Sequence, residues 1–162
     1  MTALSELYRS AEAAGSTEQV SQAGWHTGAR IGTSTGNGRM LAYHDSGVEA
    51  ECVFRAGERT LFNIMSTGYG SDTGERGFAV WSSRPGALGA IDEGVTRMEV
   101  ADADGVAVEA AIVAHTFAVD VDLGPAPQTV DEVFAPWEPP VLTVRVYGEG
   151  DALRYEGPLL TR

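Results

Sequence analysis

From residue 39 onward, apolar and polar residues alternate in short runs that are separated by turn signals. The first runs span 39–44, 48–55 and 60–65, and Asp45-Ser46-Gly47 and Ala56-Gly57-Glu58 separate them. A period of two places alternate side chains on opposite faces of a β-strand. Short strands joined by glycine-containing turns are typical of an antiparallel meander. This pattern predicts a β-rich fold and leaves little room for long helices.

The clearest hairpin signal is Asp104-Gly105, which lies between the runs 95–100 and 106–113. An Asp-Gly pair between two β-rich runs favours a tight turn with positive φ angles. Ala114-His115-Thr116 predicts another tight turn. The remaining strands are expected at 77–82, 117–123, 141–147 and 152–156, and 83–93 is expected to be a connection.

The first 38 residues have a different pattern. Leu4, Leu7, Tyr8 and Ala11 recur at helical spacing, which predicts a helix over residues 3–14. Residues 16–38 are rich in Gly, Ser and Thr, which indicates a linker or long loop with a short strand around Trp25. We therefore expect residues 1–38 to be a helix and a connection, and residues 39–162 to form one folding unit.

The expected fold is all-β: an antiparallel sandwich or barrel of eight to nine strands with one short N-terminal helix. A sandwich or barrel limits the unpaired backbone that an open sheet of this size would expose. With 162 residues and 43% hydrophobic residues, the chain is long enough to bury a substantial core. The residues expected to be buried are Cys52, Phe54, Phe62, Val100, Ile112, Val144 and Val146.

The net charge of the chain limits the classes of partner that it can bind. The net charge is −12, from 23 acidic and 11 basic residues, and the basic residues are scattered arginines. A negative surface repels nucleic-acid phosphates, so nucleic-acid binding would need a basic patch that the sequence does not contain. The acidity favours a protein partner with a basic surface.

The single cysteine, Cys52, excludes an intramolecular disulfide, and its strand context predicts a buried structural side chain. No segment approaches the roughly 18 apolar residues of a membrane span. The N-terminus also lacks the pattern of a signal peptide. We expect a cytoplasmic protein if Met1 is the native start, and an extracytoplasmic one if the chain is truncated.

The motifs in the sequence give little indication of catalysis. Residues 32–36, Gly-Thr-Ser-Thr-Gly, match the nucleophile elbow of serine hydrolases, but that motif needs a strand before it and a helix after it. Here a strand is expected to follow, so Ser34 is predicted to be inert. The three histidines have no metal-ligand spacing. We expect no catalytic residue, no cofactor and no metal, with a weak calcium site formed by Asp102, Asp104, Asp120 and Asp122 as the alternative.

The best candidate for a binding surface is the segment 124–140, which holds five of the seven prolines. Proline cannot donate a backbone hydrogen bond, so this segment is expected to be a loop. Phe134 and Trp137 offer apolar anchors, and Asp131 and Glu138 offer charge. Together with Tyr69 of the loop 66–75, these residues are the predicted partner-binding set. A second interpretation is that Trp137 covers one end of the core.

Several of these features resemble one family. They are the strand ending in Ala50-Glu51-Cys52, the loop after Met65, the runs 94–100 and 102–105, Phe117, and the run 144–147. In this order they resemble the extracytoplasmic β-sandwich domains of actinobacterial membrane proteins, including some attached to transmembrane anti-sigma factors. The resemblance covers roughly 120 residues and implies interaction or sensing, with no catalytic residues. The chain departs from the family by lacking a membrane anchor and a Trp-rich strand near Phe117.

The most favoured function is therefore a non-enzymatic protein-interaction or sensing module. The alternatives are an acidic immunity or inhibitor protein that masks a basic toxin surface, and a structural subunit of a phage-like assembly. An enzyme that uses Ser34 ranks last. The sequence does not fix the oligomeric state.

Overall fold

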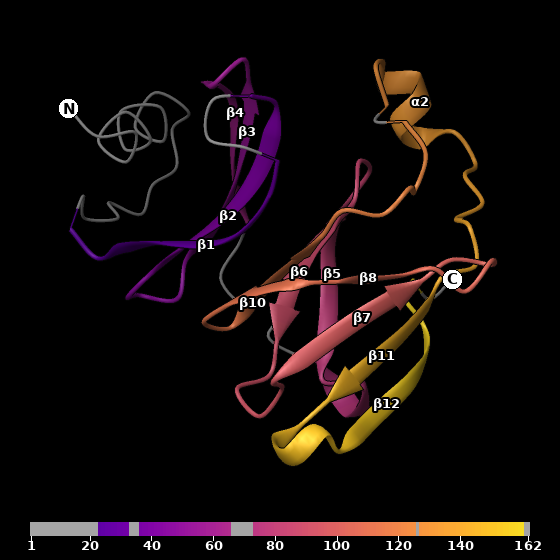
Figure 1. The fold of residues 1–162 in the computed structure, drawn as a ribbon. Coiled ribbons are helices and arrows are strands. Elements are labelled where there is room, and N and C mark those ends of the chain that lie inside the picture. The colour runs from indigo at the N-terminus through magenta and orange to yellow at the C-terminus, as the bar shows by residue number, and fades with distance from the viewer. Residues whose placement is uncertain (1–22, 33–35, 66–72, 126, 161–162) are drawn as a thin grey trace. The chain divides into compact units, whose positions relative to one another are not determined.

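The computed structural model describes residues 23–32, 36–65, 73–125 and 127–160. The helix expected at 3–14 and the candidate residue Tyr69 lie outside these ranges. The chain divides into two compact units, residues 1–69 and residues 70–162, and each is described by itself. Figure 1 shows strands of both units and helix α2 of unit 2.

Unit 1 contains one four-stranded antiparallel sheet, here the first sheet, with the order β1-β2-β3-β4. Its strands are β1 (Trp25–Gly32), β2 (Gly38–His44), β3 (Glu49–Arg55) and β4 (Glu58–Met65). The meander expected over residues 39–65 is confirmed. β1, however, lies where mainly a linker was expected, and it pairs with β2 as far as Gly32 opposite Gly38. A register shift between Thr27 and Arg30 interrupts its alternation, which explains why the period of two is hard to detect.

Unit 2 contains two four-stranded antiparallel sheets. The second sheet has the order β5-β6-β10-β9, with β5 (Phe78–Ser83), β6 (Ala87–Ile91), β10 (Thr116–Val119) and β9 (Ala111–Val113). The third sheet has the order β12-β11-β7-β8, with β12 (Leu153–Pro158), β11 (Thr143–Tyr147), β7 (Arg97–Ala101) and β8 (Ala107–Glu109). Three short helices complete the described part of unit 2: η1 (Gly74–Arg76), α2 (Val130–Phe134) and η2 (Glu149–Asp151).

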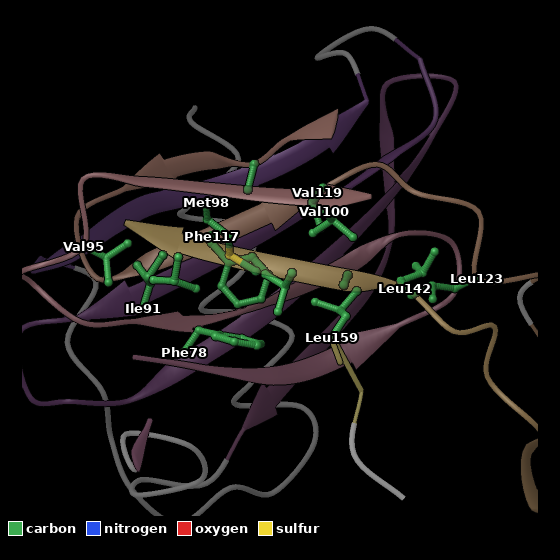
Figure 2. Close-up of a cluster of buried hydrophobic side chains, with 14 residues drawn as sticks. Phe78, Ile91, Val95, Met98, Val100, Phe117, Val119, Leu123, Leu142 and Leu159 are labelled. Atoms are coloured by element: carbon green, nitrogen blue, oxygen red, sulfur yellow. The ribbon is translucent and has the colours of Figure 1, made fainter. Parts of the chain in front are cut away.

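The second and third sheets share one hydrophobic core, shown in Figure 2. Phe78 and Phe117 of the second sheet meet edge to face, with ring centroids 6.0 Å apart. From the third sheet, Met98, Val100 and Val144 enter the same cluster, and each is fully buried. Unit 2 is therefore built from two layers around one core, which is how a sheet with one apolar face is stabilised.

The all-β, antiparallel class is confirmed, but three four-stranded sheets exceed the eight to nine strands expected. One cause is β6, which occupies part of the expected connection 83–93. All five of its residues are buried, so its sequence has no alternation of apolar and polar side chains. Gly89 is required there, because a Cβ atom would lie 1.9 Å from the carbonyl oxygen of Ala79.

The other cause is the run 106–113, which was expected to be one strand. It divides into β8, which pairs with β7, and β9, which pairs with β10 in the other sheet. Ala110 lies between them and is buried. The Asp104-Gly105 hairpin between β7 and β8 is confirmed, and the Asp102 carboxylate accepts the N–H groups of Asp104 and Val106 at 3.0 Å each.

Most of the expected core residues are buried. Cys52, Val100, Val144 and Val146 are inaccessible to solvent. Two expectations need correction, because Phe54 and Ile112 are only partly buried. Phe54 lies near the end of β3 and Ile112 on the edge strand β9, where fewer neighbours cover a side chain. The side chain of Phe62 is outside the described part of the structure.

Candidate functional site

The proline-rich segment, residues 124–140, leads toward β11 and contains helix α2, where only a loop was expected. In Figure 1, α2 stands apart from the strands of unit 2. Thr129 precedes the helix, and its hydroxyl accepts the N–H of Glu132 at 3.2 Å. The Glu132 carboxylate in turn accepts the N–H of Gln128 at 2.6 Å. These two bonds resemble a capping box, whose Thr-x-x-Glu signature was visible in the sequence.

The helix ends early for a local reason. Ala135 is extended, with φ −64° and ψ 143°, and it precedes Pro136. The ring of a proline disfavours helical geometry at the residue before it. A five-residue helix held by a capping box at one end and a proline at the other therefore fits this sequence.

α2 exposes large apolar side chains. Phe134 is 81% exposed, Val130 is 71% exposed, and Val133 is also exposed. Acidic side chains lie between and beside them, and none of these is buried. We call this set the α2 surface; it consists of Val130, Asp131, Glu132, Val133, Phe134, Glu138 and Val141. Its apolar side chains are exposed and are not packed in the core. Their contact with water is unfavourable in the isolated chain.

Trp137 behaves differently from Phe134. It is partly buried and packs against the core cluster of unit 2. The Arg84 guanidinium lies 4.3 Å from its ring centroid, which is within the range of a cation–π contact. Of the two interpretations of Trp137, this packing agrees with a residue that covers the core and fastens the segment to it.

The predicted partner-binding residues are thus divided. Asp131 and Phe134 lie on α2 and are exposed, and Glu138 is exposed beside Trp137. Trp137 faces the core, and Tyr69 lies outside the described residues. Sequence reasoning missed the three exposed valines, although Thr129 and Glu132 have the spacing of a capping box, which was a usable signal for the helix that carries two of them.

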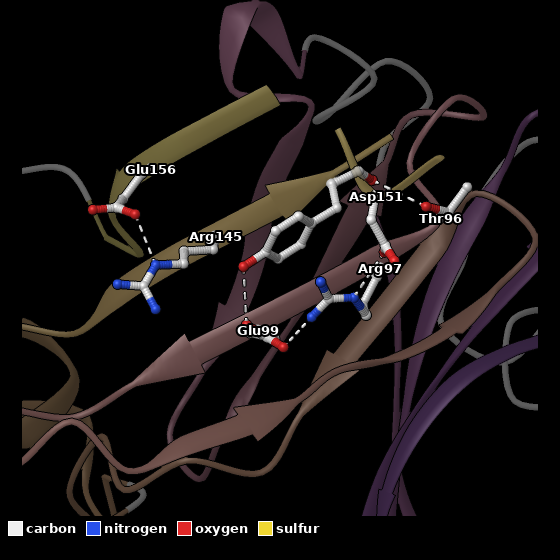
Figure 3. A network of polar contacts seen from close by, with 7 residues as sticks. Thr96, Arg97, Glu99, Arg145, Asp151 and Glu156 are labelled. Atoms are coloured by element: carbon white, nitrogen blue, oxygen red, sulfur yellow. Dashed lines mark hydrogen bonds and ion pairs between the residues drawn. The ribbon is translucent and has the colours of Figure 1, made fainter. Parts of the chain in front are cut away.

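The outer face of the third sheet carries a polar network, shown in Figure 3. Arg97 forms ion pairs with Glu99 and Asp151, and the hydroxyl of Tyr147 donates to Glu99 at 3.2 Å. Beside it, Arg145 pairs with Glu156 at 2.7 Å. These arginines already have carboxylate partners, so the network explains cross-strand pairing better than it explains ligand binding.

Unit 1 carries a cluster of aromatic and polar groups where β1 meets the turn after β2. The His26 ring stacks on Tyr43 with centroids 5.1 Å apart, and its Nε2 lies 2.7 Å from the Asp45 carboxylate. The Nδ1 atom of His44 accepts the N–H of Ser46 at 3.0 Å, which assigns the proton to Nε2. That Nε2–H then donates to the carbonyl of Ala23 at 2.9 Å. The Nδ1 atom of His44 therefore stabilises the turn, and its Nε2 atom ties the turn to Ala23, which precedes β1.

Two carboxylates on β3 differ in their surroundings. Glu51 is buried and accepts a hydrogen bond from the Nε of buried Arg39 at 2.6 Å. Glu49 is half-buried, and desolvation raises its pKa to about 7. A carboxyl with this pKa takes up a proton near neutrality, so we expect Glu49 to contribute to the pH response of the first sheet.

The elbow motif around Ser34 does not have the structural context that its chemistry needs. Residues 33–35 lie outside the described ranges, but the residues on both sides are placed. Gly32 ends β1 and Gly38 begins β2, and the two are paired in one antiparallel sheet. A strand therefore follows the motif where a nucleophile elbow requires a helix.

Within the ranges that the structure covers, no group of three or more His, Cys, Asp or Glu residues is arranged to hold a metal. No helix in that part of the chain is long and apolar enough to cross a bilayer. No protein-family model, no curated protein and no solved structure matches this chain.

Proposed function

We propose that this chain is a non-enzymatic protein-interaction module that binds its partner through the α2 surface. The observation that carries the proposal is the 81% exposure of Phe134 on a short helix whose neighbours Val130 and Val133 are also exposed. Contiguous apolar side chains on the surface of a soluble domain mark interaction sites, and aromatic residues at their centre contribute most of the binding free energy.

The local structure favours docking. The capping bonds around Thr129 and Glu132 hold α2 in place, and Trp137 fastens the segment to the core. Five prolines restrict the backbone between residues 124 and 140. A segment that is restricted before binding loses less conformational entropy when a partner covers it.

The charges of the segment suggest the chemistry of the partner. Asp131 and Glu132 lie on α2 between Val130 and Val133, Glu138 follows in the same segment, and residues 124–140 contain no basic side chain. A partner with a basic rim around an apolar pocket would be complementary to this arrangement. Its association rate should fall as salt screens the attraction, since the Debye length is about 8 Å at physiological ionic strength.

The resemblance to extracytoplasmic β-sandwich domains of actinobacterial membrane proteins agrees with an interaction role. In that family the implied role is interaction or sensing without catalysis. We propose the same class of role for this chain, with the sensing part resting on the resemblance alone.

The test is affinity capture with the full chain, followed by quantitative mass spectrometry and binding measurements on the recombinant partner. Phe134→Ser should lose the partner while keeping the thermal midpoint of the wild type, because Phe134 touches little of the core. Leu153→Ser is the matched control, since it removes a 55% exposed apolar side chain from β12. A partner that binds wild type, Phe134→Ser and Leu153→Ser equally would show that the α2 surface is not the interface.

A further inference from the structure

A second candidate site lies in unit 2 and shares no residue with the α2 surface. It is a cavity of about 200 Å³ between β5 and the chain that follows β12. Its lining combines one cation, two hydroxyls and an apolar wall. The lining residues are Arg76, Val80, Trp81, Ser82, Ser83, Leu159 and Leu160.

The cation is held in a fixed position. The Nη2 atom of Arg76 donates to the carbonyl oxygens of Pro158 and Leu159, at 2.7 Å each. Its guanidinium carbon lies 4.1 Å from the ring centroid of Phe78 and 5.6 Å from that of Tyr155. Two carbonyls and two rings therefore position the group without neutralising its charge.

Within the described ranges, Arg76 lacks the carboxylate partner that three other arginines of this unit have. Arg97, Arg145 and Arg154 each pair with a carboxylate. Among the residues that the structure describes, no carboxylate forms an ion pair with Arg76, and its Nε is enclosed without a hydrogen-bond partner. A partly buried positive charge without a counter-charge is costly, so an anion that enters this cavity is stabilised.

We propose that this cavity binds a carboxylate that carries a small branched apolar group. A guanidinium matches the planar geometry of a carboxylate, and the apolar wall of Val80, Leu159 and Leu160 suits a hydrocarbon branch. The cavity is smaller than the roughly 300–1,000 Å³ of drug-sized ligand sites, so the ligand group is small. The net charge of −12 opposes multiply charged anions and favours a single negative charge.

The test is a titration of the full, isotope-labelled chain with 3-methylbutanoate, followed by NMR. Chemical shifts of the Trp81 indole and of the Ser82 and Ser83 amides should change and saturate. The neutral 3-methylbutanamide, which has the same shape, should bind at least tenfold more weakly. Equal binding of the acid and the amide, or equal binding of inorganic phosphate, would overturn the proposal.

Three variants test whether the acid binds in this cavity. Ser83→Leu fills the cavity without touching the Arg76 contacts and should abolish the saturable shifts in a folded protein. Arg76→Gln should weaken binding at least tenfold, whereas Arg145→Gln removes a positive charge elsewhere in unit 2 and should leave it unchanged. Unchanged binding in folded Ser83→Leu would show that the acid binds elsewhere, whether or not Arg76→Gln folds.

Such a carboxylate has two natural sources, a free short-chain acid and the C-terminus of a polypeptide. An acetylated dipeptide that ends in leucine, compared with its C-terminal amide, separates them. Binding of the peptide acid at least tenfold tighter than 3-methylbutanoate assigns the site to a polypeptide C-terminus. Weaker binding of the peptide acid than of 3-methylbutanoate assigns the site to a free acid.

Discussion

At the scale of single residues, tertiary contacts decide whether a side chain belongs to the core or to the surface. Trp137 and Phe134 are three residues apart in the same segment, and the sequence places both among the candidates for binding. Only their tertiary contacts separate them, because Trp137 packs on the core beneath Arg84 while Phe134 is exposed. Sequence spacing predicts that both are important, but not which neighbours each has.

This difference gives a direct prediction. Trp137→Ala should lower the free energy of unfolding of unit 2 by about 2–3 kcal/mol, somewhat less than a fully buried tryptophan, because it removes a partly buried ring from the core. Phe134→Ala should change it by less than about 0.5 kcal/mol, as an exposed site does. Urea unfolding of both variants measures this. Equal destabilisation by the two substitutions would contradict the assignment of Trp137 to the core.

Glu49 gives a second prediction, on pH. Its pKa is about 7 in the folded chain, whereas the ordinary pKa of a glutamate is 4.5. Between these pH values the folded state therefore binds more protons than the unfolded state. Glu49 should therefore contribute most to the free energy of unfolding of unit 1 below pH 4.5. This contribution should be lost as the pH rises through 7. The loss should be about 1–2 kcal/mol after discounting for solvent screening.

Urea unfolding at several pH values, followed by NMR signals from unit 1, measures the slope of the free energy of unfolding against pH. Glu49→Gln should remove it and stabilise unit 1 at pH 8. Glu58→Gln, which changes an exposed glutamate of the same sheet, should keep the slope of the wild type. An unchanged slope in Glu49→Gln would mean that another group causes it.

At the scale of elements, the period of two identifies strands that have one buried face. This is why the strands after residue 39 and the hairpin at Asp104-Gly105 could be predicted. β6 could not, because its five residues are all buried and do not alternate. The division of residues 106–113 between two sheets could not be predicted either, because alternation does not show which strands pair with each other.

Gly89 tests the packing of β6. A Cβ atom there would lie 1.9 Å from the Ala79 carbonyl and 2.9 Å from the Phe117 ring, so backbone must move. Gly89→Ala should lower the free energy of unfolding by about 1–3 kcal/mol or more, as overpacking does. Gly94→Ala is the control, because its Cβ would meet only the flexible end of Arg154. Similar thermal midpoints of the two variants would contradict the tight approach of β5 and β6.

The buried ion pair between β2 and β3 gives another prediction at this scale. Arg39→Met should destabilise unit 1 by about 3–5 kcal/mol, since it leaves the Glu51 carboxylate buried without its partner. The double variant with Arg39→Met and Glu51→Leu should recover most of this loss, because no uncompensated charge remains. Unfolding measurements on the two single variants and the double variant form the cycle. Additive losses would show that the two residues do not act as a pair.

At the scale of the whole molecule, the chain divides after residue 69, although residues 39–162 were expected to form one unit. The strands of unit 1 and unit 2 have the same period of two, so the pattern alone does not reveal that they belong to different sheets. The Gly- and Ser-rich stretch 66–75 was the signal at this position, and it was interpreted as a loop within one domain. The net charge of −12 does not bear on this division, and the basic partner that it suggests stays a prediction.

Photo-crosslinking tests whether the α2 surface is the docking site. A photoreactive amino acid at position 134 should join the full chain to one polypeptide, and the same amino acid at position 153 should not. Excess unmodified wild type should suppress the crosslink, whereas excess Phe134→Ser should not. A crosslink of equal yield from position 153, or one that Phe134→Ser suppresses as well as the wild type does, would show that the α2 surface is not the docking site.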